Sequence, residues 1–183
     1  MTEYKLESVR MFYALKEVFD KYFEYAGQGM TRRVYKCGDG TVIKIPHCLD
    51  RANDARLDQC YGERELAEYL EYGNSMNIRE VSAFTSNAAD KAHGGPGRTA
   101  EIIDFGYFGD ISIVVMEEVE PLDKDGDTQL DWDEIDDDIP SWAWSRDMDG
   151  PQVGKTKDGR IVVYDYPCAD NDYEVQGSRR WYG

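Results

Sequence analysis

The segment RVYKCGDGTVIKI, residues 33–45, decides the fold. Its two ends are rich in β-branched and aromatic residues, and the glycine-rich residues 38–40 separate them, which is typical of a β-hairpin. Pro46 follows the second run and lacks a backbone N–H, so we expect the strand to end there. Lys44 lies at the end of this second strand. The segment therefore predicts an antiparallel hairpin that carries a lysine near its end.

Other elements follow on both sides of this hairpin. Apolar residues at helical spacing predict helices over residues 8–25 and 53–72. Residues 86–99 show no periodicity and predict a loop. Strand-like runs predict a second hairpin over residues 101–118 and a third one around a turn at residues 157–159. This order predicts an α+β fold with an antiparallel sheet.

The chain of 183 residues has room for one domain. We expect an N-terminal helix within residues 1–26 and the main sheet within residues 27–122. Residues 123–141 form an acidic connector, and residues 142–183 hold the remaining loops.

The formal net charge is −16, and this disfavours direct binding to nucleic acid or to anionic membranes. It fits a protein partner with a basic surface. The sequence contains no apolar run long enough to cross a bilayer, and its N-terminus lacks the layout of a signal peptide, so we expect a cytoplasmic protein. The four cysteines show no CxxC spacing, which disfavours a zinc site.

Phosphate chemistry needs four features, which here are a glycine-bearing turn, a lysine on a strand, a carboxylate on the following helix and a carboxylate that holds a metal. Gly27 and Gly29 lie before the first strand, where backbone N–H groups could approach phosphate oxygens. Lys44 ends the partner strand and could neutralise their charge. Asp165 follows the strand-like residues 161–164 and could hold Mg²⁺.

A carboxylate on the following helix would hold Lys44 in place. Glu63 and Glu65 both lie there. We prefer Glu65 because it precedes Tyr69 by four positions, so both lie on one helical face. Glu63 remains the alternative.

At these residues the chain resembles the protein-kinase-like fold, specifically the very short kinase-like proteins of bacteriophages. Residues 42–45 look like the family's Val-Ala-Ile-Lys strand, and residues 116–122 look like its hinge. Residues 147–152 have the spacing of its catalytic loop, and residues 165–167 take the place of Asp-Phe-Gly. The resemblance implies a sheet like that of the kinase N-lobe, with a truncated or absent C-lobe.

The resemblance also implies ATP with Mg²⁺ as ligands. Lys44 would contact the phosphates, Glu117 and Val119 of the hinge would contact the adenine, and Asp165 with Gln152 would hold the metal. Asp147 is the candidate catalytic base, and Asp149 competes for this role because the loop register rests on spacing alone.

Several residues depart from the family pattern. Ser145 replaces the histidine of His-Arg-Asp, Gln152 replaces the metal-binding asparagine, and Pro167 replaces glycine. A literal Asp-Phe-Gly at residues 104–106 precedes the hinge-like segment, so we interpret it as structural. The departures favour a pseudokinase over an active phosphotransferase.

The acidic connector resembles an EF-hand loop over residues 123–134. Thr128 stands where the loop needs glycine, and Pro140 follows soon after, so Ca²⁺ is the unlikely ligand. The carboxylates that such a loop would use are Asp123, Asp125, Asp127 and Glu134.

Three functional hypotheses follow. The first is a degenerate kinase-like protein, such as a phage-encoded regulator, that binds a nucleotide or a host protein. The second is an acidic inhibitor or decoy of a basic, nucleic-acid-binding host protein that uses the kinase-like fold as a scaffold. The third is a calcium-binding module.

Overall fold

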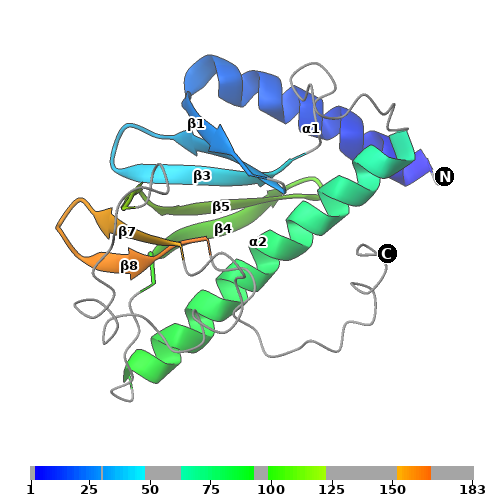
Figure 1. The fold of residues 1–183 in the computed structure, drawn as a ribbon. Coiled ribbons are helices and arrows are strands. Elements are labelled where there is room, and N and C mark those ends of the chain that lie inside the picture. The colour runs from blue at the N-terminus through cyan, green and yellow to red at the C-terminus, as the bar shows by residue number, and fades with distance from the viewer. Residues whose placement is uncertain (1–2, 30, 48–62, 93–98, 123–151, 166–183) are drawn as a thin grey trace.

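The computed structural model describes residues 3–29, 31–47, 63–92, 99–122 and 152–165, and these form an α+β fold (Figure 1). The two helices are α1 (Glu3–Tyr22) and α2 (Glu63–Ala92). An antiparallel sheet of five strands has the order β1-β2-β3-β5-β4, and a smaller sheet has the order β6-β7-β8. The strands of the larger sheet are β1 (Glu24–Gln28), β2 (Arg32–Lys36), β3 (Thr41–Pro46), β4 (Ile102–Phe108) and β5 (Ile111–Glu117). Those of the smaller sheet are β6 (Val119–Pro121), β7 (Val153–Thr156) and β8 (Ile161–Val163).

The three predicted hairpins are confirmed. β2 pairs with β3, β4 with β5, and β7 with β8, each in antiparallel register. Their turns contain Gly38, Gly40, Gly109 and Gly159, all with positive φ, which glycine adopts without a steric penalty. The turn residues therefore carried the local signal that located the hairpins.

The second helix differs from the prediction. α2 begins at Glu63 and continues through Tyr72 to Ala92, so part of the expected loop 86–99 is helical. Gly73, Asn74 and Ser75 interrupt the helical pattern and imitate a helix end. In the structure these residues lie inside the helix because it is held by contacts with the sheet.

The first helix also differs at its ends. α1 covers Glu3–Tyr22, and the chain then forms β1, which contains Gly27. The register between β1 and β2 shifts between Tyr25 and Gly27, as in a β-bulge. The glycine-bearing turn predicted before β2 is therefore shorter than expected, since Gly27 lies within a strand.

Two apolar clusters lie on opposite faces of the larger sheet. One contains Tyr35, Ile43 and Ile45 and packs against α1 and the first turns of α2. The other contains Val42, Val114 and Met116 and packs against β8. Successive side chains along a strand point to opposite faces of the sheet. Ile43 and Ile45 point to the first face, so Lys44, between them in sequence, points to the second face.

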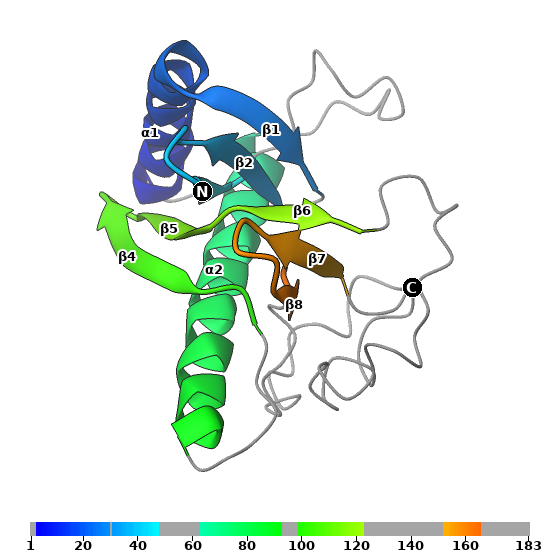
Figure 2. The ribbon, with the colours of Figure 1, turned by 90° about the vertical axis from the view of Figure 1, so that its left-hand side faces the viewer.

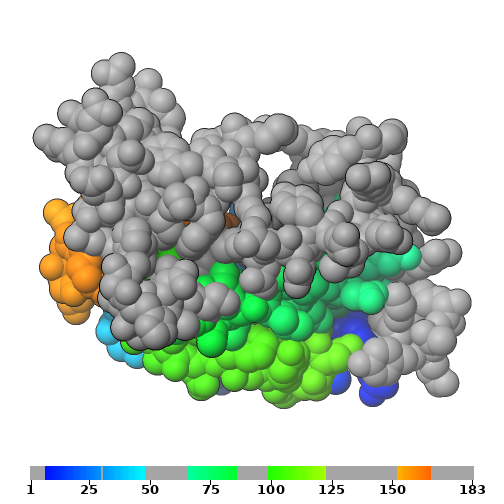
Figure 3. Space-filling model, turned by 90° about the horizontal axis from the view of Figure 1, so that it is seen from below, coloured from blue at the N-terminus to red at the C-terminus, as the bar shows by residue number. Residues whose placement is uncertain are grey.

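The middle of α2 lies very close to the sheet. A Cβ atom at Gly73 would lie 2.5 Å from the carbonyl oxygen of Thr31 and 2.9 Å from Cβ of Pro46, so only glycine allows this approach. Figure 2 shows α2 running past the strands, with α1 beside one end of the helix and the β7–β8 hairpin beside its middle. In Figure 3 this hairpin (orange) and α1 (blue) lie at opposite sides of the view. Within the described residues no helix is long and apolar enough to cross a membrane.

Candidate functional site

Four charged side chains meet between α2 and the second face of the sheet. Arg32 comes from β2, Lys44 from β3, Glu80 from α2, and Asp165 directly follows Tyr164 at the end of the β8 segment. Nη1 of Arg32 donates to Oε2 of Glu80 at 2.5 Å, and Nζ of Lys44 donates to Oε1 of the same carboxylate at 2.8 Å. We call these four residues the charge cluster.

Asp165 closes the charge cluster from the other side. Its Oδ1 forms an ion pair with Nη2 of Arg32 and accepts a hydrogen bond from Nζ of Lys44 at 3.5 Å. The φ angle of Asp165 is 55°, in the left-handed region that aspartate tolerates better than most residues. One carboxylate oxygen is thus shared by two cations.

Burial strengthens the electrostatic interactions among these four side chains. Arg32 and Lys44 are each 5% exposed and Glu80 is 0% exposed, whereas the side chain of Asp165 is 34% exposed. Burial lowers the pKa of Lys44 from 10.5 to about 8; the Glu80 carboxylate opposes this shift and the Arg32 guanidinium adds to it. Asp165 is therefore the member of the cluster that solvent and ligands can reach.

The sheet register places the two cations together. Lys44 pairs with Val34 across the β2–β3 ladder, and Arg32 lies two residues before Val34 on the same face. Glu80 follows Gly73 by seven residues, which is two helical turns, so the close approach at Gly73 brings Glu80 to the same face of the sheet. Asn77, between them, donates to the backbone oxygen and hydroxyl of Ser112 and fixes the helix on β5.

The structure brings Lys44 and Asp165 together, as the sequence predicted, but the partner of Lys44 is not Glu65. Glu80 takes this role. Glu65 and Glu63 lie on the same helix, 15 and 17 residues before Glu80, which corresponds to roughly 22–26 Å along the axis. The prediction that Glu65 pairs with Lys44 was therefore wrong, although the carboxylate does come from the helix after β3.

The other predicted site residues lie apart from the cluster or beside it. Gly27 is in β1 and Gly29 in the turn that follows, where its N–H donates to the carbonyl oxygen of Arg32 at 2.9 Å. Glu117 ends β5, and its carboxylate binds Arg160 and the N–H of Glu101. Val119 begins β6 and packs in the second apolar cluster.

Gln152 lies beside Asp165, at the open end of the β7–β8 hairpin. Its carbonyl oxygen accepts a hydrogen bond from the N–H of Tyr164 at 2.8 Å, and the residue is exposed. The remaining predicted residues lie outside the described residues. These are Asp147, Asp149, Asp123, Asp125, Asp127 and Glu134.

In the charge cluster, the carboxylate that was predicted to hold Mg²⁺ is already bound by two cations. Oδ1 of Asp165 already accepts from the guanidinium of Arg32 and faces the ammonium of Lys44. A divalent cation bound to this carboxylate would be repelled by both groups. In the part of the chain that the structure describes, no three His, Cys, Asp or Glu side chains form a group that could hold a metal.

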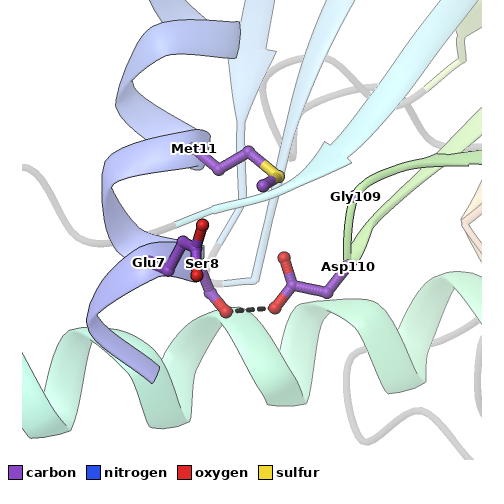
Figure 4. A pocket seen from close by; sticks show the side chains of 5 residues that line it. All are labelled: Glu7, Ser8, Met11, Gly109 and Asp110. Carbon is purple, nitrogen blue, oxygen red and sulfur yellow. Dashed lines mark hydrogen bonds between the residues drawn. The ribbon is translucent and has the colours of Figure 1, made fainter. Parts of the chain in front are cut away.

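A shallow pocket of about 250 Å³ lies between α1 and the β4–β5 turn (Figure 4). Its lining residues are Glu7, Ser8, Met11, Gly109 and Asp110. Ser8 donates to the carboxylate of Asp110, and the Met11 side chain reaches toward Gly109, as the figure shows. None of its lining residues belongs to the charge cluster, so we assign the pocket no role in the site.

Sequence reasoning missed Arg32 and Glu80. A signal for Arg32 was present in the hairpin, which was correctly predicted. Val34 pairs with Lys44, and Arg32 lies two residues from Val34, so Arg32 and Lys44 share a face of the sheet. Glu80 lies beyond the predicted end of the helix, so the sequence pattern assigned it no role. Once α2 is known to extend to Ala92, the spacing of seven residues between Gly73 and Glu80 places Glu80 on the side of the helix that faces the sheet.

The cluster has the chemistry of an anion site, since two buried cations are held in fixed positions by one fully buried carboxylate. Buried ionisable groups with a perturbed pKa are concentrated at functional sites. No protein-family model, curated protein or solved structure matches this chain, so the charge cluster is interpreted from its own geometry.

Proposed function

We propose that this chain is a degenerate kinase-like protein that binds a nucleotide at the charge cluster and transfers little or no phosphate. In protein kinases a lysine on the third strand pairs with a glutamate on the following helix, and the aspartate of the metal motif lies nearby. Lys44, Glu80 and Asp165 stand in this order. The observation that carries the proposal is the 2.8 Å bond from Lys44 to Glu80, with Asp165 on the other side of the lysine.

The architecture around the cluster supports the same proposal. β3 is the third strand of the five-stranded sheet, and α2 connects β3 to β4. The β7–β8 hairpin precedes Asp165, as a short hairpin precedes the metal motif in the family that the sequence resembles. The N-lobe likeness is thus supported by the order of these elements along the chain as well as by motif order.

The energetics of the cluster also favour a binding role. Burying two cations and the Glu80 carboxylate carries a large desolvation cost, which their mutual attraction often does no more than offset. Apolar residues of similar volume would stabilise a core at least as well. A function at the cluster accounts for keeping these three charges in the interior.

The altered residues support binding without efficient chemistry. Ser145, Gln152 and Pro167 replace residues that the family uses for catalysis and metal binding. A Mg²⁺ ion bound to Asp165 would also be repelled by the charges of Arg32 and Lys44. We therefore expect a nucleotide to stabilise the native state without measurable turnover.

Thermal melting tests the proposal. At an ATP concentration about 100 times Kd, binding stabilises a native state by about 2.7 kcal/mol, which corresponds to roughly 5–10 °C for a chain of this size. The melt should be recorded with ATP in Mg²⁺ and, separately, with ATP in EDTA. We expect a shift in at least one of the two buffers.

Two lysine variants make the melt specific. Lys44→Met keeps the length of the side chain and removes its charge, and it should abolish the shift. Lys21→Met removes the same charge from an exposed site on α1 and should leave it unchanged. Equal shifts in wild type and Lys44→Met would exclude the cluster as the nucleotide site.

A second function, binding of a protein partner, is favoured by the edge strand β4. This strand carries exposed large apolar side chains at Ile103, Tyr107 and Phe108, which are 54%, 56% and 50% exposed. The net charge of −16 favours a basic partner. A melting temperature that ATP does not change in either buffer would leave this function, including the decoy hypothesis, as the better account.

A further inference from the structure

Asp165 is held differently from the other members of the charge cluster. Glu80 is 0% exposed and binds both cations through two separate oxygens, at 2.5 and 2.8 Å. Asp165 is 34% exposed, offers one oxygen to both cations, and lies 3.5 Å from the ammonium of Lys44. Glu80 is thus the fixed counter-ion, whereas Asp165 is the one that an incoming anion can displace.

The two cations present the donors that a phosphate group needs. Glu80 holds Nη1 of Arg32, which leaves Nη2 directed at Asp165 together with Nζ of Lys44. Nη2 carries two N–H donors that can contact phosphate oxygens, and the adjacent ammonium adds a point charge. A single carboxylate oxygen now occupies the place between them.

The charge balance of the cluster limits what can replace Asp165. Two cations and two carboxylates sum to zero in the ligand-free cluster. If a phosphate displaced Asp165, Glu80 would remain on both cations, so the cluster would face the phosphate with a net charge of +1 and with the two cationic groups in direct contact, where a divalent ion would be repelled.

We propose that Arg32 and Lys44 bind the phosphate chain of the ligand directly, without a divalent cation, and that Asp165 occupies the phosphate position in the ligand-free protein. This inference rests on the proposed nucleotide function and specifies its cofactor requirement. Arg32 is a binding residue, Glu80 a positioning residue, and Asp165 an internal competitor of the ligand. The ligand class is a nucleoside triphosphate or another polyphosphate in its metal-free form.

Asp165 can be either a competitor of the phosphate or a ligand of a metal, and the substitution Asp165→Asn distinguishes these two roles. They predict opposite changes in the affinity for ATP. Asparagine has nearly the same shape and also tolerates the left-handed backbone at this position, but it carries no charge. If Asp165 competes with phosphate, the variant binds ATP several-fold more tightly than wild type in EDTA. If Asp165 holds a metal that bridges to the phosphates, the variant binds ATP more weakly and only in Mg²⁺.

The measurement is isothermal titration of the full chain with ATP and with inorganic tripolyphosphate, each in EDTA and in excess Mg²⁺. Asp158→Asn is the matched control, because it removes the same charge from an exposed carboxylate on the β7–β8 turn, 63% exposed, outside the cluster. The control should bind like wild type, which excludes a general effect of net charge. Tripolyphosphate distinguishes recognition of the phosphate chain from recognition of the nucleoside.

A second variant keeps the test valid if Asp165→Asn folds poorly. Arg32→Lys retains the charge but cannot bind Glu80 through one nitrogen and the phosphate through another, and it should weaken binding of ATP in EDTA more than tenfold. Arg33→Lys changes the neighbouring residue, on the opposite face of the sheet, and should leave that affinity unchanged.

The outcomes are distinct. Tighter ATP binding by Asp165→Asn in EDTA, with Asp158→Asn equal to wild type, supports the inference. Binding of ATP by wild type only in Mg²⁺, or weaker binding by Asp165→Asn, overturns the inference while the nucleotide function stands. Absence of binding by wild type and by both variants in either buffer overturns the nucleotide function as well.

Discussion

Two neighbouring arginines on β2, Arg32 and Arg33, are buried on opposite faces of the sheet and serve different networks. Arg32 is 5% and Arg33 is 7% exposed, so burial alone does not distinguish them. Arg33 donates to the hydroxyl of Tyr35 at 3.1 Å and to Gln28 at 2.8 Å, and its guanidinium lies 4.6 Å from the ring centroid of Tyr25. This second network is completed by Asp20, which accepts from Tyr35 at 2.7 Å.

The difference lies in how charge is shared. The Arg33 network joins Arg33 and the partly exposed Lys16 to a single carboxylate, that of Asp20, with neutral partners beside them, and all of them come from residues 16–35. The charge cluster joins two cations to two carboxylates that are 36 to 121 positions away from Lys44 in sequence. A buried arginine therefore indicates little by itself, whereas two buried cations that share carboxylates indicate a site.

Removal of one carboxylate from each network should give the largest contrast. Glu80→Gln leaves Arg32 and Lys44 with one half-exposed counter-ion, and loss of one partner of buried charges costs about 3–5 kcal/mol in the free energy of unfolding. Asp20→Asn removes a carboxylate whose side chain is 36% exposed and should cost about 1 kcal/mol. Urea unfolding measures both; equal losses would contradict the distinction between the two networks.

A pH titration of stability should give the next largest effect. Because the pKa of Lys44 is about 8 in the folded state and 10.5 when unperturbed, the unfolded chain binds more protons between these values. The free energy of unfolding should therefore rise with pH from about 8 upward, by at most about 1.4 kcal/mol per pH unit. The experiment compares wild type with Lys44→Met between pH 7 and 9.5. The same pH slope in both proteins would show that Lys44 titrates normally.

The sequence was sufficient where the signals were local. Residues 33–45 gave the β2–β3 hairpin and placed Lys44 near the end of its strand, because turn glycines and β-branched runs act over a few residues. The hairpins around Gly109 and Gly159 were predicted for the same reason. Asp165 was selected because it directly follows such a hairpin.

The sequence was insufficient where the signals were tertiary. Gly73, Asn74 and Asn77 lower the helical propensity of α2, so the helix was predicted to end at Tyr72. In the structure these residues face the sheet: Gly73 allows close contact, and the carboxamide of Asn74 binds the N–H and hydroxyl of Ser112. The error in the helix end led to the choice of Glu65 and hid Glu80.

Gly73→Ala tests how strongly the charge cluster depends on this contact. Alanine would gain about 1 kcal/mol of helix propensity, but its Cβ would collide with the carbonyl oxygen of Thr31 and with Pro46. We therefore expect a net loss of about 1–2 kcal/mol in the free energy of unfolding. Gly106→Ala is the control, because nothing lies within 4 Å of the new Cβ. The Asp20–Tyr35 contacts, on the other face, should not change in NMR spectra. A perturbation of that face equal to that at Lys44 would show that the two networks are coupled.

The smallest expected effect concerns Tyr35, in the second network. Burial and the hydrogen bond to Asp20 raise the pKa of Tyr35 to about 12, and Arg33 opposes this shift. The folded state keeps the phenol proton longer than the unfolded state, so this contribution to stability is complete below pH 10 and is lost as the pH rises toward 12. The titration is followed by NMR of tyrosine labelled at the ring, with Tyr22, 68% exposed, as an internal reference.

Asp20→Asn should lower the pKa of Tyr35 toward 10 without reaching it, because burial of the ring remains. Glu80→Gln should leave the Tyr35 titration unchanged, since the two networks lie on opposite faces of the sheet. A change in Tyr35 after loss of Glu80 would mean that β2 transmits charge effects between Arg32 and Arg33. The two arginines would then belong to one electrostatic unit, and the proposed nucleotide site would extend through the sheet to α1.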